Sequence, residues 1–287
     1  MKELVYAASV ARPHANSFKE DLSALYDSKY CTDVDLVYQG VVFPVHRAIL
    51  SVRCPRFREL LARYPDYGTQ VPIHIHTPGI DVNMFSALLR YLYTGDFNAD
   101  ECKLDHDGSV ELIMRLGDEF GHPQPLEHDL RTLLDTGIHS DAVITFCSDS
   151  DAHEPLTPEG YAKGTKHELR CHKAILAARS PFFRNLVLRR ARSGEELTER
   201  ALHSPTRIVL DESVIPRRYA RVLLHALYTD SVDLGCIVRS SVSVCSLSEV
   251  QAMVAGKGHM TLVDEAMEIY QIGQFLDLPI LSQGMLS

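Results

Sequence analysis

The fold is decided by two stretches that align without a gap, "DLSALYDSKYCTDVDL" at Asp21–Leu36 and "DLRTLLDTGIHSDAVI" at Asp129–Ile144. Three aspartates and two leucines coincide at a constant distance of 108 residues. A second matching pair, "HRAIL" at His46–Leu50 and "HKAIL" at His172–Leu176, stands 126 residues apart. Because the offset only grows along the chain, we interpret the second stretch of each pair as part of a repeat that has acquired insertions.

The offset rises in three steps, which predicts three insertions in the second copy. We place them within residues 147–168, in the Arg/Glu stretch after Leu186, and within residues 235–260. These segments are rich in polar or charged residues, and loops tolerate extra length at little cost in free energy. We therefore divide the chain into a flexible leader at 1–16, a first domain at 17–125 and a second domain at 126–287, with a helix at 126–135 that the domains share or that links them.

Both copies show the same order of predicted elements. Apolar residues at helical spacing predict a first helix over 17–26, and alternation predicts a strand at 34–38 that turns at Gln39-Gly40. Ser180-Pro181, matched by Cys54-Pro55, marks the start of a helix after each histidine stretch. Further predicted elements are a strand at 71–75, a helix with Met84, Leu88, Leu89 and Leu92 on one face, and final helices at 110–120 and 262–276. The pattern predicts an α+β class with two tandem folds, each a small sheet flanked by a helical cluster.

Charge and composition exclude several classes of function. The net charge of −9 and the pI near 5.8 argue against a surface that neutralises phosphates or anionic lipids. No run approaches the about 18–20 apolar residues of a membrane span. The seven cysteines form no CxxC pair, which fits reduced thiols. We expect a protein of the cytoplasm or the nucleus that binds neither nucleic acid directly nor a membrane.

The sequence holds no pattern typical of catalysis. A GxSxG elbow is absent, and Cys171 and His172 are sequence neighbours that do not face each other on a helix. The "HIH" at His74–His76 would place two imidazoles on one face of a strand, but the second copy has Val209 and Asp211 there. We expect no enzyme activity, no cofactor, no metal and no small-molecule substrate.

An acidic and a basic residue recur together in both copies. Asp33 precedes Arg47 in the first copy, and Asp141 precedes Lys173 in the second. An acid at a strand start and a base at a helix start predict a partly buried ion pair, which specifies packing or an interface. We interpret the histidines of the two matching stretches as hydrogen-bonded residues where the chain enters a helix, with contact to a partner as the alternative.

These spaced motifs resemble the BTB/POZ domain from about Ser17 onward. In the first copy the resemblance rests on Asp33, Val34, Phe43, His46, Arg47, Ala48, Leu50, Pro55, Phe57 and Tyr93–Gly95. In the second copy it rests on Asp141, His172, Lys173, Ala174, Leu176, Ser180, Pro181, Phe183, Tyr228 and Thr229. The second copy departs from the pattern at Ala142 and Asp230.

The resemblance implies protein–protein binding without catalysis. Many family members are substrate adaptors for cullin-3 ubiquitin ligases, and these carry a hydrophobic-x-Glu motif after the helix that starts with Ser-Pro. The second copy offers Leu197 and Glu199 at that place, and the first copy offers Tyr64 and Asp66. We expect an adaptor that binds cullin-3 in a ubiquitin ligase complex. The alternative is a dimerisation scaffold or transcriptional co-regulator that does not bind a cullin and holds its partner at the recurring acid–base pair.

Dimers of this family bury the first helix against a partner, and both copies keep that helix. The residues expected at the interface are Leu22, Leu25, Leu130 and Leu133. We expect the two copies to pair with each other as a pseudo-dimer within one chain, which a covalent link favours by raising their effective concentration. A homodimer of two chains is the alternative.

Overall fold

The computed structural model describes residues 17–97, 106–147, 168–193, 204–238 and 262–283. The chain forms two compact units, one built from residues 14–139 with 172–179 and the other from 140–171 with 180–287. The leader at 1–16 and most of the three inserted segments, at 148–167, 194–203 and 239–261, lie outside the described residues. None of the described helices is long and apolar enough to cross a membrane.

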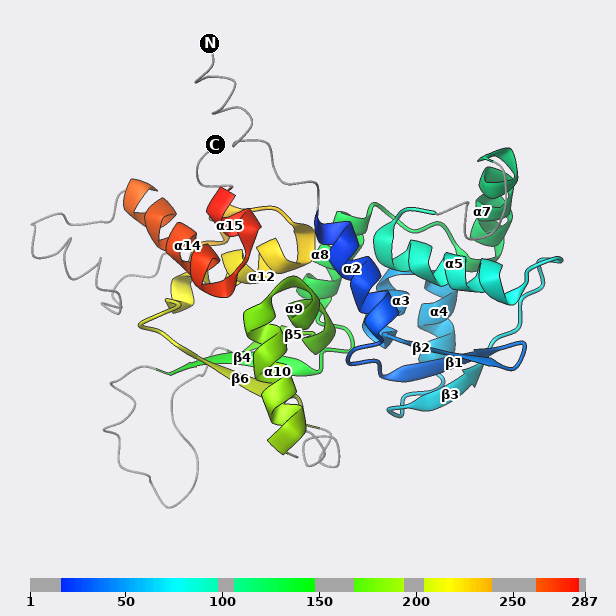
Figure 1. The fold of residues 1–287 in the computed structure, drawn as a ribbon, viewed down its shortest axis with the longest axis horizontal. Coiled ribbons are helices and arrows are strands. Elements are labelled where there is room, and N and C mark those ends of the chain that lie inside the picture. The colour runs from blue at the N-terminus through cyan, green and yellow to red at the C-terminus, as the bar shows by residue number, and fades with distance from the viewer. Residues whose placement is uncertain (1–16, 98–105, 148–167, 194–203, 239–261, 284–287) are drawn as a thin grey trace, which may run out of the picture. The chain divides into compact units, whose positions relative to one another are not determined.

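The elements of the first unit follow the predicted order (Figure 1). They are α2 (Ser17–Ser28), β1 (Val34–Tyr38), β2 (Val41–Val45), α3 (Arg47–Arg53), α4 (Pro55–Leu61), β3 (Thr69–Pro72), α5 (Val82–Thr94), α7 (His106–Phe120), α8 (Leu126–Thr136) and α9 (Lys173–Arg179). Helices α8 and α9 come from the second repeat, yet they belong to this unit.

The second unit contains the remaining elements of the second repeat. They are β4 (Ala142–Cys147), β5 (Leu169–Cys171), α10 (Pro181–Ser193), β6 (Thr206–Asp211), the short turn η2 (Arg217–Tyr219), α12 (Ala220–Thr229), the short turn η3 (Leu234–Cys236), α14 (Leu262–Leu276) and α15 (Pro279–Gln283). Two related sets of a small sheet with helices confirm the α+β tandem architecture.

The two sheets have the same topology. Their strand orders are β2-β1-β3 and β5-β4-β6, and the central strand is antiparallel to the first neighbour and parallel to the second. The predicted turn between β1 and β2 is confirmed: Gln39 and Gly40 have φ of 48° and 80°, as a two-residue hairpin turn requires. The predicted strand at 71–75 is wrong in its bounds. The last bond of this segment to β1 runs from the Ile73 amide to the Val37 carbonyl oxygen at 2.9 Å, because β1 ends at the turn that begins with Gln39.

Aromatic contacts attach α5 to the first sheet. The ring of Phe85 lies 4.7 Å from that of Tyr38 and 5.1 Å from that of Phe43, measured between centroids. Phe85 is fully buried. Met84, which the helical spacing placed on one face with Leu88, Leu89 and Leu92, is only half-buried. The sheet therefore holds α5 through contacts between large rings, and each such contact stabilises the fold by more than the buried area of the rings alone would.

The residue directly before α4, and its equivalent before α10, hydrogen-bonds the end of the final helix of its repeat, α7 or α14. The Cys54 Sγ donates to the Phe120 carbonyl oxygen at 3.1 Å, and the Ser180 hydroxyl donates to the Leu276 carbonyl oxygen at 2.8 Å. Both side chains are completely buried, so each also satisfies a carbonyl at a helix end that has no intrahelical partner.

Candidate interaction surfaces

The loop between α4 and β3 is held by the buried guanidinium of Arg47. It donates to the carbonyl oxygens of Leu61 at 3.0 Å, Tyr64 at 2.5 Å and Asp66 at 3.0 Å. Arg47 is only 4% exposed, and its bond to Leu61 is buried, where an unmade hydrogen bond is expensive, while the bonds to Tyr64 and Asp66 are partly buried. A guanidinium has several donors in a fixed fork, which is why one side chain can fix three points of this loop.

Asp33 fastens the same loop to the start of β1. Its carboxylate accepts from the Arg47 amide at 2.7 Å, while the nearest atom of the guanidinium is 3.9 Å away. Its carbonyl oxygen accepts from the Gly68 amide at 2.8 Å, at the other end of the loop. Asp33 and Arg47 thus lie next to each other. The charge of Arg47 faces the carbonyls of the loop between α4 and β3 rather than an open groove.

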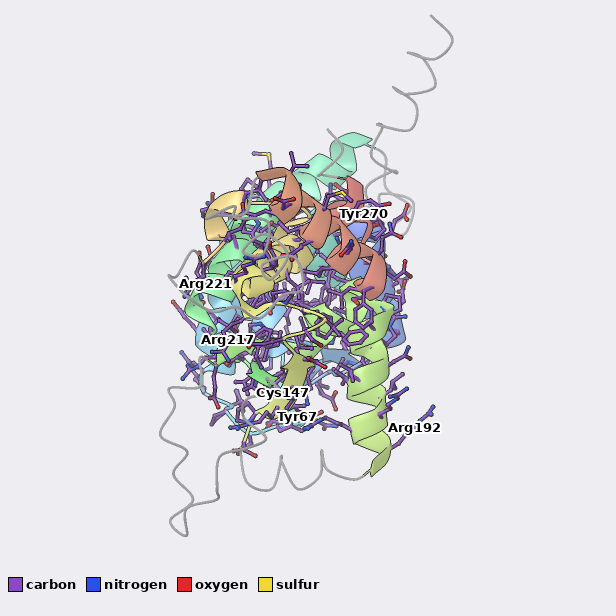
Figure 2. The ribbon with its side chains drawn as sticks, turned by 90° about the vertical axis from the view of Figure 1, so that its left-hand side faces the viewer. Tyr67, Cys147, Arg192, Arg217, Arg221 and Tyr270 are labelled. Atoms are coloured by element: carbon purple, nitrogen blue, oxygen red, sulfur yellow. The ribbon has the colours of Figure 1, made fainter. Side chains whose placement is uncertain are left out.

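The anchored loop presents the two first-copy candidates for cullin binding. The Asp66 side chain is exposed and Tyr64 is half-buried, while their carbonyl oxygens point inward to Arg47. The second-copy candidates, Leu197 and Glu199, lie outside the described residues. Figure 2 shows Arg192 projecting from the last turn of α10, close to where the described part of the chain stops.

The acid–base pair of the second copy is divided between the two compact units. Asp141 stands directly before β4, and its carbonyl oxygen accepts from the Thr206 amide at 2.9 Å. Lys173 is the first residue of α9 and is 6% exposed. Lys173 therefore occupies the buried position that Arg47 has at the start of α3.

His46 is a buried, hydrogen-bonded residue at the start of α3. Its Nε2 lies 2.7 Å from the Tyr30 carbonyl oxygen, which can only accept, so this nitrogen carries the proton. Its Nδ1 then accepts from the Tyr93 hydroxyl at 2.6 Å, and that hydroxyl accepts from the His46 amide at 2.9 Å. Burial lowers the pKa of His46 to about 4, only partly opposed by the bond to Tyr30. The His172 ring makes the matching bond, to the Ile138 carbonyl oxygen at 2.8 Å.

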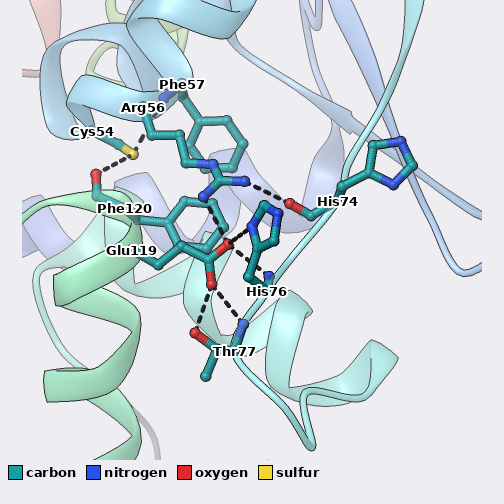
Figure 3. A network of polar contacts seen from close by, with 8 residues as sticks. All are labelled: Cys54, Arg56, Phe57, His74, His76, Thr77, Glu119 and Phe120. Carbon is teal, nitrogen blue, oxygen red and sulfur yellow. Dashed lines mark hydrogen bonds and ion pairs between the residues drawn. The ribbon is translucent and has the colours of Figure 1, made fainter.

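The "HIH" stretch belongs to a structural network around Glu119 (Figure 3). The Glu119 carboxylate accepts from Arg56 at 2.7 Å, from the His76 amide at 2.8 Å, and from the amide and hydroxyl of Thr77 at 2.8 and 2.6 Å. Burial alone would raise the pKa of Glu119, but the hydrogen bonds from Thr77 and His76 outweigh it and lower the pKa to about 2. The His74 ring points away from this network. Within the described ranges, no three His, Cys, Asp or Glu side chains are grouped so that they could hold a metal ion.

Helices of both repeats pack on each other inside the first unit. Helix α2, the first helix of repeat one, lies against α9, and α8, the first helix of repeat two, lies against α3. The four leucines expected at an interface, Leu22, Leu25, Leu130 and Leu133, are 0–3% exposed. The first helix of each repeat therefore packs against the histidine-stretch helix of the other repeat, which is α3 after His46 in repeat one and α9 after His172 in repeat two.

Two arginines that the sequence did not single out join these helices. Arg53 Nη1 lies 2.6 Å from Asp129 Oδ2, and Arg179 forms the corresponding ion pair with Asp21. A signal was present in the sequence: "HRAILSVR" and "HKAILAAR" both end in arginine, at the same position of the repeat.

Comparison with known proteins agrees with this architecture. The family model described as BTB/POZ domain matches residues 22–136 and 161–255. The chain is 52% identical to BTB/POZ domain-containing protein 7 of Mus musculus and 51% identical to the protein of that name of Homo sapiens, in each case over 99% of this chain and 25% of the relative. It is also 35% identical to BTB/POZ domain-containing protein 9 of Rattus norvegicus over 29% of this chain and 13% of that protein. The chain thus spans about a quarter of the length of the first two relatives.

Proposed function

The chain belongs to the BTB/POZ domain family, a family of protein–protein interaction modules, and from this premise we propose that it acts as a substrate adaptor that binds cullin-3 in a ubiquitin ligase complex. The observation that carries the proposal is the loop after α4. Arg47 holds the main chain at Tyr64 and Asp66, so that an aromatic side chain and an acidic side chain, two residues apart, are presented in a fixed arrangement. A loop ordered before binding loses less conformational entropy on association, which favours affinity.

Binding to a purified cullin-3 N-terminal region tests this proposal. With the loop of the first repeat as the docking site, Tyr64→Ala is expected to weaken the measured affinity about 30-fold, since loss of a central apolar anchor commonly costs about 2 kcal/mol. Arg63→Ala is the matched control, because Arg63 is an exposed residue of the same loop. Isothermal titration calorimetry gives the affinity and the stoichiometry together.

The second repeat supplies the competing arrangement. A loss of binding in Leu197→Ala with Glu199→Ala, at unchanged binding by Tyr64→Ala, would move the docking site to the second repeat. No binding by the unsubstituted chain would refute the adaptor function and leave the scaffold or transcriptional co-regulator as the function to test.

We further propose that the pairing partner of each repeat is the other repeat of the same chain. Within the first unit α2 packs against α9 and α8 packs against α3, and the four leucines of α2 and α8 that a second chain would need are 0–3% exposed. Light scattering is expected to give a monomer of 32.2 kDa. This mass should not change between about 1 and 100 µM, well below the roughly millimolar effective concentration of linked domains. A species of twice this mass at every concentration would contradict the self-pairing.

A further inference from the structure

The two arginine–aspartate pairs are related by the repeat. Asp21 and Asp129 occupy the same position of the first helix in their copies, and Arg53 and Arg179 are the last residues of α3 and α9. The first pair joins Arg53 to Asp129, and the second joins Arg179 to Asp21. Each pair therefore joins one repeat to the other. In the first pair the arginine comes from repeat one, and in the second pair it comes from repeat two.

Both arginines are buried at the contact between the repeats. The side chains of Arg53 and Asp129 are 1% and 8% exposed, and those of Arg179 and Asp21 are 2% and 33% exposed. Arg53 also donates from Nε to the Leu92 carbonyl oxygen at 2.8 Å, which connects the pair to the end of α5. The guanidinium of Arg179 lies 4.9 Å from the centroid of the Phe18 ring.

A buried ion pair adds little net stability, because removing both charges from water costs about as much as their attraction returns. Its effect is on specificity: an arrangement that separates the charges leaves a buried arginine without its carboxylate. Arg53 and Arg179 sit at helix ends, so a shift of α2 or α8 by one turn would break a pair.

We propose that these two pairs determine how the repeats recognise each other, by selecting which helices meet and in what register. The inference rests on the self-pairing proposed above. Each repeat contributes to these pairs one aspartate from its first helix and one arginine from the last position of its α3 or α9 helix, so every repeat is complementary to every other. The covalent link selects the repeat of the same chain, and the same surface fits a second copy of the chain once the internal pairing is broken.

Charge reversal in the full chain tests the inference. Asp129→Arg and Arg53→Asp are each expected to lower the melting temperature by about 10 °C, because each places like charges at a buried contact. Combining the two substitutions restores an ion pair of reversed direction and is expected to be more stable than Arg53→Asp alone, although the bond to the Leu92 carbonyl oxygen stays lost. The matched control is Asp96→Lys, which reverses one partner of the exposed Lys19–Asp96 pair, 37% and 66% exposed, and is expected to leave the melting temperature unchanged.

Mixing the two single variants supplies a second measurement. After the two are refolded together, the arginine introduced at position 129 of one chain can meet the aspartate introduced at position 53 of the other. Light scattering should therefore show a species of twice the chain mass that neither variant forms alone. The inference is overturned if the single reversals behave like the control, or if the combined variant is no more stable than Arg53→Asp and the mixture gives no species of twice the chain mass. A dimeric wild type would refute only the proposal that the repeats pair within one chain. Recovery of stability by the combined variant would then still show that the two ion pairs select the partner helices, but between two chains.

Discussion

Replacing Arg47 by methionine is expected to lower the free energy of unfolding of the first unit by about 3–5 kcal/mol. The substitution keeps most of the buried volume but removes the donors of three hydrogen bonds, to the carbonyl oxygens of Leu61, Tyr64 and Asp66. The Leu61 carbonyl, left unmatched in a buried site, costs about 1–3 kcal/mol, the two partly buried carbonyls cost less each, and Asp33 loses its nearby positive charge. Urea denaturation followed by circular dichroism measures the change.

Two further variants make this result interpretable. Arg47→Lys places in the first repeat the residue that the second repeat has at this position, and a single ammonium cannot reach three separated carbonyls in the geometry of a guanidinium. Its stability should therefore fall between those of the wild type and Arg47→Met. Arg63→Met removes an exposed arginine from the same loop and should change stability by less than about 0.5 kcal/mol. Equal unfolding free energies for Arg47→Met and Arg63→Met would show that the three bonds do not hold the loop.

The elements could be predicted closely because local patterns determine them. The predicted final helix at 262–276 coincides with α14, and the expected turn at Gln39-Gly40 is present with the left-handed backbone that it needs. In both cases neighbouring residues carry the signal, as apolar spacing or as a turn dipeptide. The recurring Asp33 and Arg47 were found in the same way, because two copies of one pattern reveal positions that a single copy would not.

The partners of buried charges could not be predicted, because they depend on tertiary packing. Arg53 and Asp129 are 76 residues apart. The expected pairing of the two copies places the helix at 126–135 at an interface, but no local pattern indicates that its aspartate meets the last residue of α3. The Arg56–Glu119 pair shows how far the repeats have diverged at such sites. At the equivalent positions the second repeat has Phe182 and Phe275, whose rings lie 5.2 Å apart, so an aromatic contact replaces an ion pair at the same junction of helices.

Acid is expected to destabilise the first unit between pH 6.5 and about 4, before most of its carboxylates are protonated. Burial lowers the pKa of His46 from 6.5 to about 4 in the folded state. Above pH 6.5 the imidazole is neutral in both states, so the unfolding free energy does not depend on it. Below pH 6.5 the unfolded chain takes up a proton that the folded chain does not, and stability falls as the pH falls. The loss is complete near pH 4 and amounts to about 3 kcal/mol, since each pKa unit corresponds to about 1.4 kcal/mol.

The structural cause can be isolated by substitution. A proton on Nδ1 would displace the hydrogen bond from the Tyr93 hydroxyl, whereas glutamine can still donate to the Tyr30 carbonyl oxygen and has no charge to gain. His46→Gln is therefore expected to be less stable than the wild type at pH 7.5 but to lose much less stability on going to pH 4.5. Part of the slope should remain, because burial and the charge of Arg47 also lower the pKa of His139 to about 4. Urea denaturation at both pH values gives the slope, and the exposed His74→Gln is the control. Equal slopes for His46→Gln and the wild type would exclude His46 as the source of the acid sensitivity.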